Sequence, residues 1–250
     1  MRSRPGRGQV LVLAALTISL AILSTQAYVY QLSRTEASAG WSALSDYVLS
    51  IEQGSRHVVV ASLVNVSRGG ASSNLGDNLD RWESFVSGDY SYGRCDLNAT
   101  AISQAPYSDG VWLDWGTEGK GVSSACADFT LNLSGRGADV DWSFTENMTT
   151  TVLISGSWVI VETNLKKVTM VVNLLNEGEP ALAGTITIAY HNGSWRDPTQ
   201  LESYSWQDFG NGTYRYSFTD TLPGAQVQVR AQAYDRRDIF VQAEASLSEG

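Results

Sequence analysis

The residues with the clearest chemical role are six asparagines in the glycosylation motif Asn-X-Ser or Asn-X-Thr. Residue frequencies alone would give about one or two such motifs in a chain of this size, so we interpret the excess as glycosylation. Two of the six precede a glycine, where a type I′ turn would hold the side chain at a hairpin tip. The alternative is that Asn, Ser, Thr and Gly simply gather in turns. The six are Asn65, Asn98, Asn132, Asn147, Asn192 and Asn211.

Cys95 and Cys126 are the only cysteines. In an exported chain an even number of cysteines usually means pairing, so we predict a disulfide between them. It would close a loop of about 30 residues and stabilise the fold by roughly 3–4 kcal/mol. Two unpaired buried thiols are the alternative. The only histidines are His57 and His191, and with two cysteines they have no metal-ligand spacing, so we predict no metal site.

Trp112 and Trp115 flank Asp114, an arrangement that could bind sugar. A tryptophan in a β domain more often packs in the core or at its rim, and we favour packing here.

Two pairs of carboxylates, Asp139 with Asp141 and Asp235 with Asp238, resemble calcium or glycosidase sites only superficially. We interpret them as solvated surface residues. Neither histidine lies near a nucleophile motif such as G-x-S-x-G. The sequence therefore predicts no catalytic residue and no cofactor, and we expect that the protein is not an enzyme.

Composition narrows the class of protein further. The 250 residues are 43% apolar and 17% charged, which is enough apolar residues for a core. The formal charge is −9, and with Arg2, Arg4 and Arg7 set aside, 14 basic and 26 acidic residues leave −12. Such a surface repels phosphate backbones, so we expect no nucleic-acid partner.

The N-terminal residues predict a membrane anchor over residues 1–34. No charged residue occurs between Arg7 and Arg34, and residues 10–23 are almost wholly apolar. About 20 residues of helix span a bilayer core. The arginines before the stretch place the N-terminus in the cytoplasm, with the bulk of the chain outside, and Tyr28 and Tyr30 fall at the outer interface. The alternative is a signal peptide that is cleaved after Ala27.

Arg7-Gly8-Gln9 followed at once by about 20 apolar residues resembles the class III signal of archaeal type IV pilins and pilin-like proteins. The resemblance implies that a prepilin peptidase cleaves between Gly8 and Gln9. It also implies that the apolar helix is kept as a membrane anchor and, on assembly, as a filament core.

The fold class that we predict is α+β. An N-terminal transmembrane helix continues into a helical stalk over residues 35–87, because apolar residues keep a three-to-four spacing and Gly69-Gly70 interrupts it. A second short helix is indicated by Leu75, Leu79, Trp82 and Val86. Residues 88–150 are expected to form a small disulfide-tied β region.

Residues 151–250 alternate apolar and polar side chains in six or seven short runs separated by turn residues. This pattern predicts a mainly antiparallel, immunoglobulin-like sandwich.

We therefore expect a single-pass cell-membrane protein that presents a glycosylated domain on the cell surface, as a pilin-like structural or interaction subunit. Its partners would be the lipid bilayer and either further copies or other surface proteins. The alternative is a secreted or anchored binding module for carbohydrate or protein. A hydrolase is the least favoured class, because nothing in the sequence indicates a substrate.

Overall fold

The computed structural model describes residues 24–26, 44–89, 93–135 and 138–250. The fold is α+β with mostly strands, which confirms the predicted class. The chain divides into two units, Met1–Gln53 and Gly54–Gly250.

In the first unit, residues 24–26 and 44–53 are helical. Among the described residues no helix is both long and apolar enough to cross a membrane. Apart from residues 24–26, the predicted anchor over residues 1–34 lies outside them.

The second unit begins with a helix over residues 54–67, followed by α2 (Asn74–Asp89). The strands are β1 (Arg94–Ala101), β2 (Val111–Trp115), β3 (Lys120–Gly135), β4 (Ala138–Glu162), β5 (Leu165–Asn176), β6 (Glu179–Pro180), β7 (Ala183–His191), β8 (Trp195–Arg196), β9 (Ser205–Asp208), β10 (Thr213–Thr221), β11 (Val227–Asp235) and β12 (Phe240–Glu249). A 3₁₀ turn, η1 (Pro198–Gln200), lies between β8 and β9.

The 54–67 helix ends where the sequence predicts a break. Gly69 has a left-handed φ of 95°, and its N–H donates to Val66 O while the Gly70 N–H donates to Asn65 O. This pair of bonds is the Schellman motif, which suits glycine because it has no Cβ to clash at positive φ. α2 confirms the second predicted helix, since Leu75, Leu79 and Val86 are all buried.

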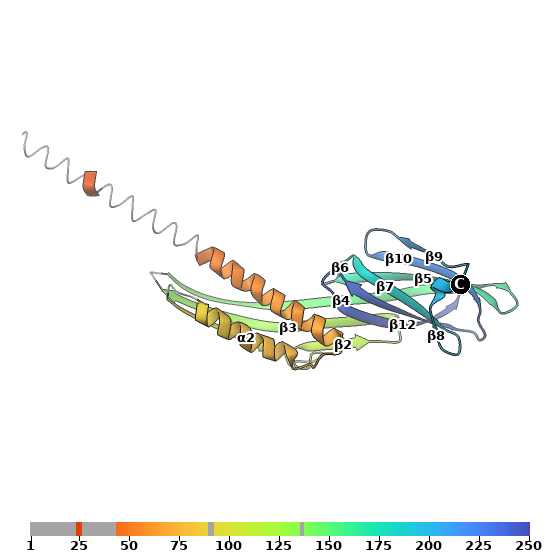
Figure 1. Ribbon diagram of the computed structural model, residues 1–250, viewed down its shortest axis with the longest axis horizontal. Helices are drawn as coiled ribbons and strands as arrows, with labels where there is room; N and C mark the ends of the chain where they lie inside the picture. The colour runs from red at the N-terminus through yellow and green to blue at the C-terminus, as the bar shows by residue number, and fades with distance from the viewer. Residues whose placement is uncertain (1–23, 27–43, 90–92, 136–137) are drawn as a thin grey trace, which may run out of the picture. The chain divides into compact units, whose positions relative to one another are not determined.

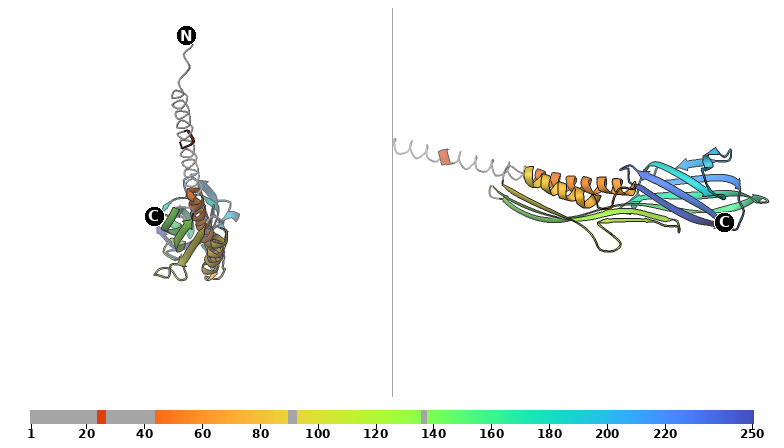
Figure 2. Two further views of the ribbon diagram at one scale, coloured as in Figure 1. Left: turned by 90° about the vertical axis from the view of Figure 1, so that its left-hand side faces the viewer. Right: turned by 60° about the horizontal axis from the view of Figure 1, so that its bottom comes forward.

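The two helices lie side by side over one face of a sheet (Figures 1 and 2), and small residues let them approach. The Trp82 ring lies against Gly54, and its Nε1 donates to Ser55 Oγ at 2.9 Å. Asn78 Nδ2 donates to Ser62 Oγ at 3.0 Å. Beneath them β3 pairs antiparallel with β1, β2 and the first part of β4. We call β1, β2, β3 and residues 138–149 of β4 the helix-covered sheet.

Strand β4 carries the chain from this sheet into a second arrangement of strands. It pairs with β3 as far as Leu153 and with β5 from Thr150 onward. The strand is thus continuous across residue 150, where the sequence predicts a boundary between two β regions.

The strands after residue 150 form two layers that we call the sandwich. One layer has the order β4-β5-β10-β9 and the other β12-β11-β7-β8. They join at one edge, where Ser248 and Glu249 of β12 pair in parallel with Ser157 and Trp158 of β4. Side chains from both layers make one buried apolar cluster, which includes Met170, Phe218 and Val229. The two layers of the sandwich therefore enclose a common apolar core.

The predicted Cys95–Cys126 disulfide is not formed in the structure. Cys95 stands opposite Leu133, seven positions along β3 from Cys126 (126 to 133). At ~3.3 Å per residue this is about 23 Å, whereas a disulfide needs Cα atoms about 4.4–6.8 Å apart. Odd and even positions of β3 also face opposite sides, so the two thiols lie on opposite faces of the sheet. Both are buried, and burial, followed by the charge of Asp128, raises the pKa of Cys126.

Candidate functional site

The uncovered side of the helix-covered sheet is a polar surface, which we call the open polar face. In the antiparallel register, residues directly opposite one another share a face. The even positions from 94 to 100 on β1 and from 128 to 134 on β3 therefore face the same side as the odd positions from 139 to 147 on β4. The exposed members of this set are Arg94, Asp96, Asn98, Thr100, Asp128, Asn132, Ser134, Asp139, Asp141, Ser143, Thr145 and Asn147.

Two predicted glycosylation sites are neighbours on this face. Asn98 stands opposite Thr130, and Asn132 stands opposite Asp96, so the two asparagines are diagonal neighbours on adjacent strands. Both are exposed. Thr100 Oγ1 donates to Asn98 Oδ1 at 3.3 Å within the same motif. The face therefore offers two adjacent side-chain amides to solvent.

Asn147 extends the row of asparagines along β4. Its Oδ1 accepts hydrogen bonds from Tyr107 OH, Ser124 Oγ and Thr149 Oγ1, each at 3.2 Å. The side chain remains exposed. Because these bonds go to the oxygen, they orient the amide without using the nitrogen, which is the atom that would carry a glycan.

Asn211 lies in the turn before β10. It is exposed, and its Oδ1 accepts from the Thr213 N–H at 3.2 Å, which closes a tight local turn. Gly210 and Gly212 on either side have left-handed φ values of 72° and 80°. The structure therefore has this asparagine at an exposed turn, as the Asn-Gly dipeptide predicts.

Asn192 differs because its amide nitrogen is engaged. Nδ2 donates to Asp220 Oδ2 at 3.3 Å and to Thr221 O at 3.2 Å, and the residue is half-buried. The same carboxylate oxygen accepts from Tyr190 OH at 2.8 Å. Burial, followed by this hydrogen bond, raises the pKa of Tyr190 to about 12. A glycan on Asn192 would have to displace these contacts.

Asn65 is also held by its neighbours. Its Oδ1 accepts from Asn74 Nδ2, and the Ser67 of its motif is buried, with Oγ accepting from the Phe240 N–H at 3.1 Å. The six motifs are thus unequal once folded. Five asparagines are exposed, but the Ser67 hydroxyl of the Asn65 motif is buried, and Asn192 is half-buried with its amide nitrogen engaged.

The predicted processing residues Gly8 and Gln9 lie outside the described residues, as do Arg2, Arg4 and Arg7. The two histidines are exposed: His57 lies in the 54–67 helix, and His191 packs edge-on against Trp195 at 5.5 Å between ring centroids. Among the described residues no group of three or more His, Cys, Asp or Glu could hold a metal ion.

The tryptophans singled out in the sequence make packing contacts. The Trp112 ring meets Tyr107 edge-on at 6.3 Å, and Trp115 meets Phe240 edge-on at 5.2 Å while donating to Ser123 Oγ. The tryptophan that the sequence analysis missed is Trp206, which is 61% exposed on β9. A four-residue strand at a sheet edge leaves little local pattern by which to find it.

The prediction that Asp235 is a solvated surface residue is wrong. It is 1% exposed, and its carboxylate accepts from Thr150 Oγ1 at 3.0 Å and from the N–H groups of Arg237 and Ile239 at 2.9 Å. Its paired residue Asp238 is exposed and bonds to Arg68 at 3.2 Å. Asp139 and Asp141 lie on the open polar face, as predicted.

Arg237 is the centre of this buried network. Its guanidinium contacts Asp235 at 2.7 Å and Glu177 at 2.6 Å, and donates to Thr149 O and Thr150 Oγ1. Burial lowers the pKa of Arg237, but the hydrogen bonds to Glu177 and Asp235 outweigh it, and the net shift is upward. The network ties the β11–β12 connection to β4, so its role is structural.

Comparison with models of known families, with curated proteins and with solved structures finds no match to this chain. Its function is therefore argued from its own residues.

Proposed function

We propose that this chain is a membrane-anchored extracytoplasmic surface protein that serves as a pilin-like structural or interaction subunit. The observation that carries the proposal is the N-terminal order of residues, in which Arg7-Gly8-Gln9 precedes a long uncharged apolar stretch. The exposure of Asn98, Asn132, Asn147 and Asn211 supports it, because an exported chain would need accessible acceptors.

We further propose that the sandwich is immunoglobulin-like. The order β4-β5-β10-β9 facing β12-β11-β7 matches the ABED and GFC layers of that fold, with β8 as an added edge strand. Modules of this kind host many functions, so the topology supports a scaffold and not an activity.

The test of the anchor is the N-terminus of the mature chain. Intact-mass spectrometry of protein purified from its native membrane is expected to give a chain that begins at Gln9. A Gly8→Val variant should accumulate with its first eight residues attached, whereas the matched Gly6→Val variant should be processed normally. A mature chain that begins at Tyr28 would contradict the proposal, because the apolar helix would then be lost.

A binding module for carbohydrate or protein is the second candidate. The observation that favours it is the exposure of Trp206 and Phe209, 61% and 49%, at one edge of the sandwich. Large aromatic side chains left open to water at an edge are typical of contact surfaces.

A further inference from the structure

Trp206 is the most exposed large apolar side chain among the described residues. It lies in β9, which pairs with β10 and with no other described strand, and forms the end of its layer. Trp206 stands directly opposite Tyr216, and Asp208 opposite Tyr214. Because Tyr214 and Tyr216 belong to the core cluster, Trp206 projects from the core side of its layer, beyond the point where the other layer covers it.

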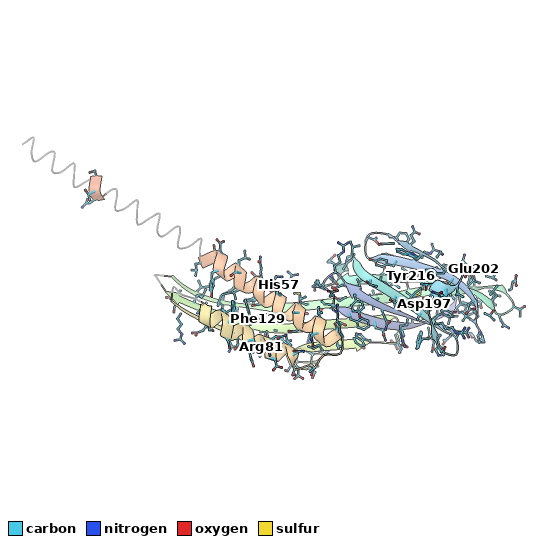
Figure 3. The ribbon with its side chains drawn as sticks, viewed as in Figure 1. His57, Arg81, Phe129, Asp197, Glu202 and Tyr216 are labelled. Atoms are coloured by element: carbon cyan, nitrogen blue, oxygen red, sulfur yellow. The ribbon has the colours of Figure 1, made fainter. Side chains whose placement is uncertain are left out.

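Further polar and aromatic groups surround Trp206. Tyr204 is half-buried against the core cluster, and the carboxylate of Asp197 is close enough to raise its pKa after burial itself. Figure 3 labels Asp197, Glu202 and Tyr216 in this part of the sandwich. We call the group the aromatic edge; its members are Asp197, Tyr204, Trp206, Asp208, Tyr214 and Tyr216.

The hydroxyl of Tyr216 faces solvent although its ring is buried. The residue is only 5% exposed, and within the described part of the chain its hydroxyl makes no hydrogen bond. No side-chain nitrogen or oxygen sealed from solvent lacks a partner there, so this hydroxyl must reach solvent. Tyr214, by contrast, accepts from the Ala183 N–H at 2.9 Å. A hydroxyl that bonds only to solvent can exchange that water for a ligand without breaking a bond within the protein.

The carboxylates of the aromatic edge are hydrogen-bond acceptors with spare capacity. Asp197 Oδ1 accepts from the Thr199 N–H and Asp208 Oδ1 from the Gly210 N–H, and each has a second oxygen that makes no hydrogen bond to a described residue. Burial, followed by the neighbouring Tyr204, Tyr214 and Asp208, raises the pKa of Tyr216, so its phenol stays neutral and can donate. The surface therefore combines an apolar ring, hydroxyls and negative charge.

We propose that the aromatic edge binds a neutral carbohydrate, with a sugar ring stacked on Trp206. The C–H face of a sugar suits an indole ring, and sugar hydroxyls can donate to Asp197 and Asp208 while accepting from Tyr216. An anionic ligand would meet the two carboxylates. A peptide strand added to β9 would find only four residues to pair with. This inference rests on the second of the two proposed functions.

The test uses the full chain in mild detergent on an array of neutral and acidic oligosaccharides, followed by calorimetric titration of the neutral oligosaccharide that binds best. Trp206→Ala is expected to weaken binding at least tenfold, and Trp206→Phe to weaken it less because a ring remains. Tyr216→Phe removes only the hydroxyl and should cost a few-fold. Trp195→Ala is the matched control, because Trp195 packs under Arg230 at 4.0 Å in the other layer, and binding should be unchanged.

Three results would overturn the proposal: an array without signal, binding confined to acidic glycans, or equal loss in the Trp195→Ala and Trp206→Ala variants. Capture of a peptide or protein at Trp206 in place of sugar would overturn it as well. None of these results bears on which residue begins the mature chain. Failure of the carbohydrate proposal is therefore distinguishable from failure of the anchor proposal.

Discussion

The helix-covered sheet and the sandwich share the strand β4 but bury it in different ways. In the helix-covered sheet one face lies under helices and the other is the open polar face. In the sandwich the strand faces a second layer of strands. Both halves show the same alternation of side chains, so the alternation sets which face is buried but not what covers it.

Residues 121–127 of β3, between the helix-covered sheet and the sandwich, show a different pattern of burial. All residues from Gly121 to Ala127 on β3 are buried, including Ser123 and Ser124, whereas from Asp128 onward burial alternates. The β2–β3 turn contacts β12 here, since the Gly119 N–H donates to Glu244 O at 2.7 Å and the Glu244 N–H to Gly116 O at 2.9 Å. The small side chains in residues 121–127 of β3 allow other segments of the chain to pack against both faces of this strand.

The largest expected loss of stability comes from core substitutions, which also test whether the helix-covered sheet and the sandwich unfold together. Phe129 lies in the core of the helix-covered sheet and Phe218 in that of the sandwich, and both are fully buried. Replacing either by alanine should destabilise the protein by about 3–5 kcal/mol. Because β4 is continuous, both variants should shift one common transition in calorimetry and denaturant unfolding. Two transitions, each moved by only one variant, would show that the halves are independent.

The Arg237 network should make the main polar contribution to the joint unfolding of the helix-covered sheet and the sandwich. Arg237→Leu leaves Asp235 buried without its ion pair and is expected to cost about 3 kcal/mol, near the lower end of measured losses for buried pairs. Arg230→Leu breaks the more exposed pair with Glu244 and should cost about 1 kcal/mol or less. Denaturant midpoints of the two variants measure the difference. Equal losses would mean that the Arg237 network adds nothing beyond the partly buried Arg230–Glu244 pair.

The close approach of β12 to β3 can be tested at Gly121. A Cβ on this residue would overlap the carbonyl oxygen of Gln242, so Gly121→Ala should destabilise the protein by about 1–3 kcal/mol. Gly76→Ala is the matched control, because it lies within α2 with no neighbour near its Cβ position, and it should be neutral or stabilising by up to about 1 kcal/mol. The order of the two melting temperatures checks the prediction, and a stable Gly121→Ala protein would contradict it.

The smallest effect on stability is expected for glycan attachment. If the exported chain is glycosylated, site-resolved mass spectrometry should find Asn98, Asn132, Asn147 and Asn211 more fully occupied than Asn192, whose amide nitrogen is engaged. Asn65 should also be less occupied, because the Ser67 of its motif is buried. Replacing exposed Asn132 by glutamine should change the free energy of unfolding by no more than about 0.5 kcal/mol. Full occupancy of Asn192 would show that modification precedes formation of its contact with Asp220.

Local patterns in the sequence determined where most helices and strands of this protein lie and which of their faces are buried. The spacing of Leu75, Leu79 and Val86 predicted α2, and Gly69-Gly70 predicted the end of the helix before it. Alternation predicted the strands of the sandwich. These features depend on residues within one element, where backbone geometry alone fixes which side chains share a face.

The tertiary structure decided what depends on register and on neighbours distant in sequence. The spacing of Cys95 and Cys126 allowed a disulfide, but the pairing of β1 with β3 puts the two thiols on opposite faces. Asp235 reads as a surface carboxylate until Arg237 and Thr150 enclose it. The local pattern around Trp206 gives no sign that its side chain is 61% exposed. A sequence pattern states which side of an element avoids water, whereas only the packing of distant strands determines which residues are covered.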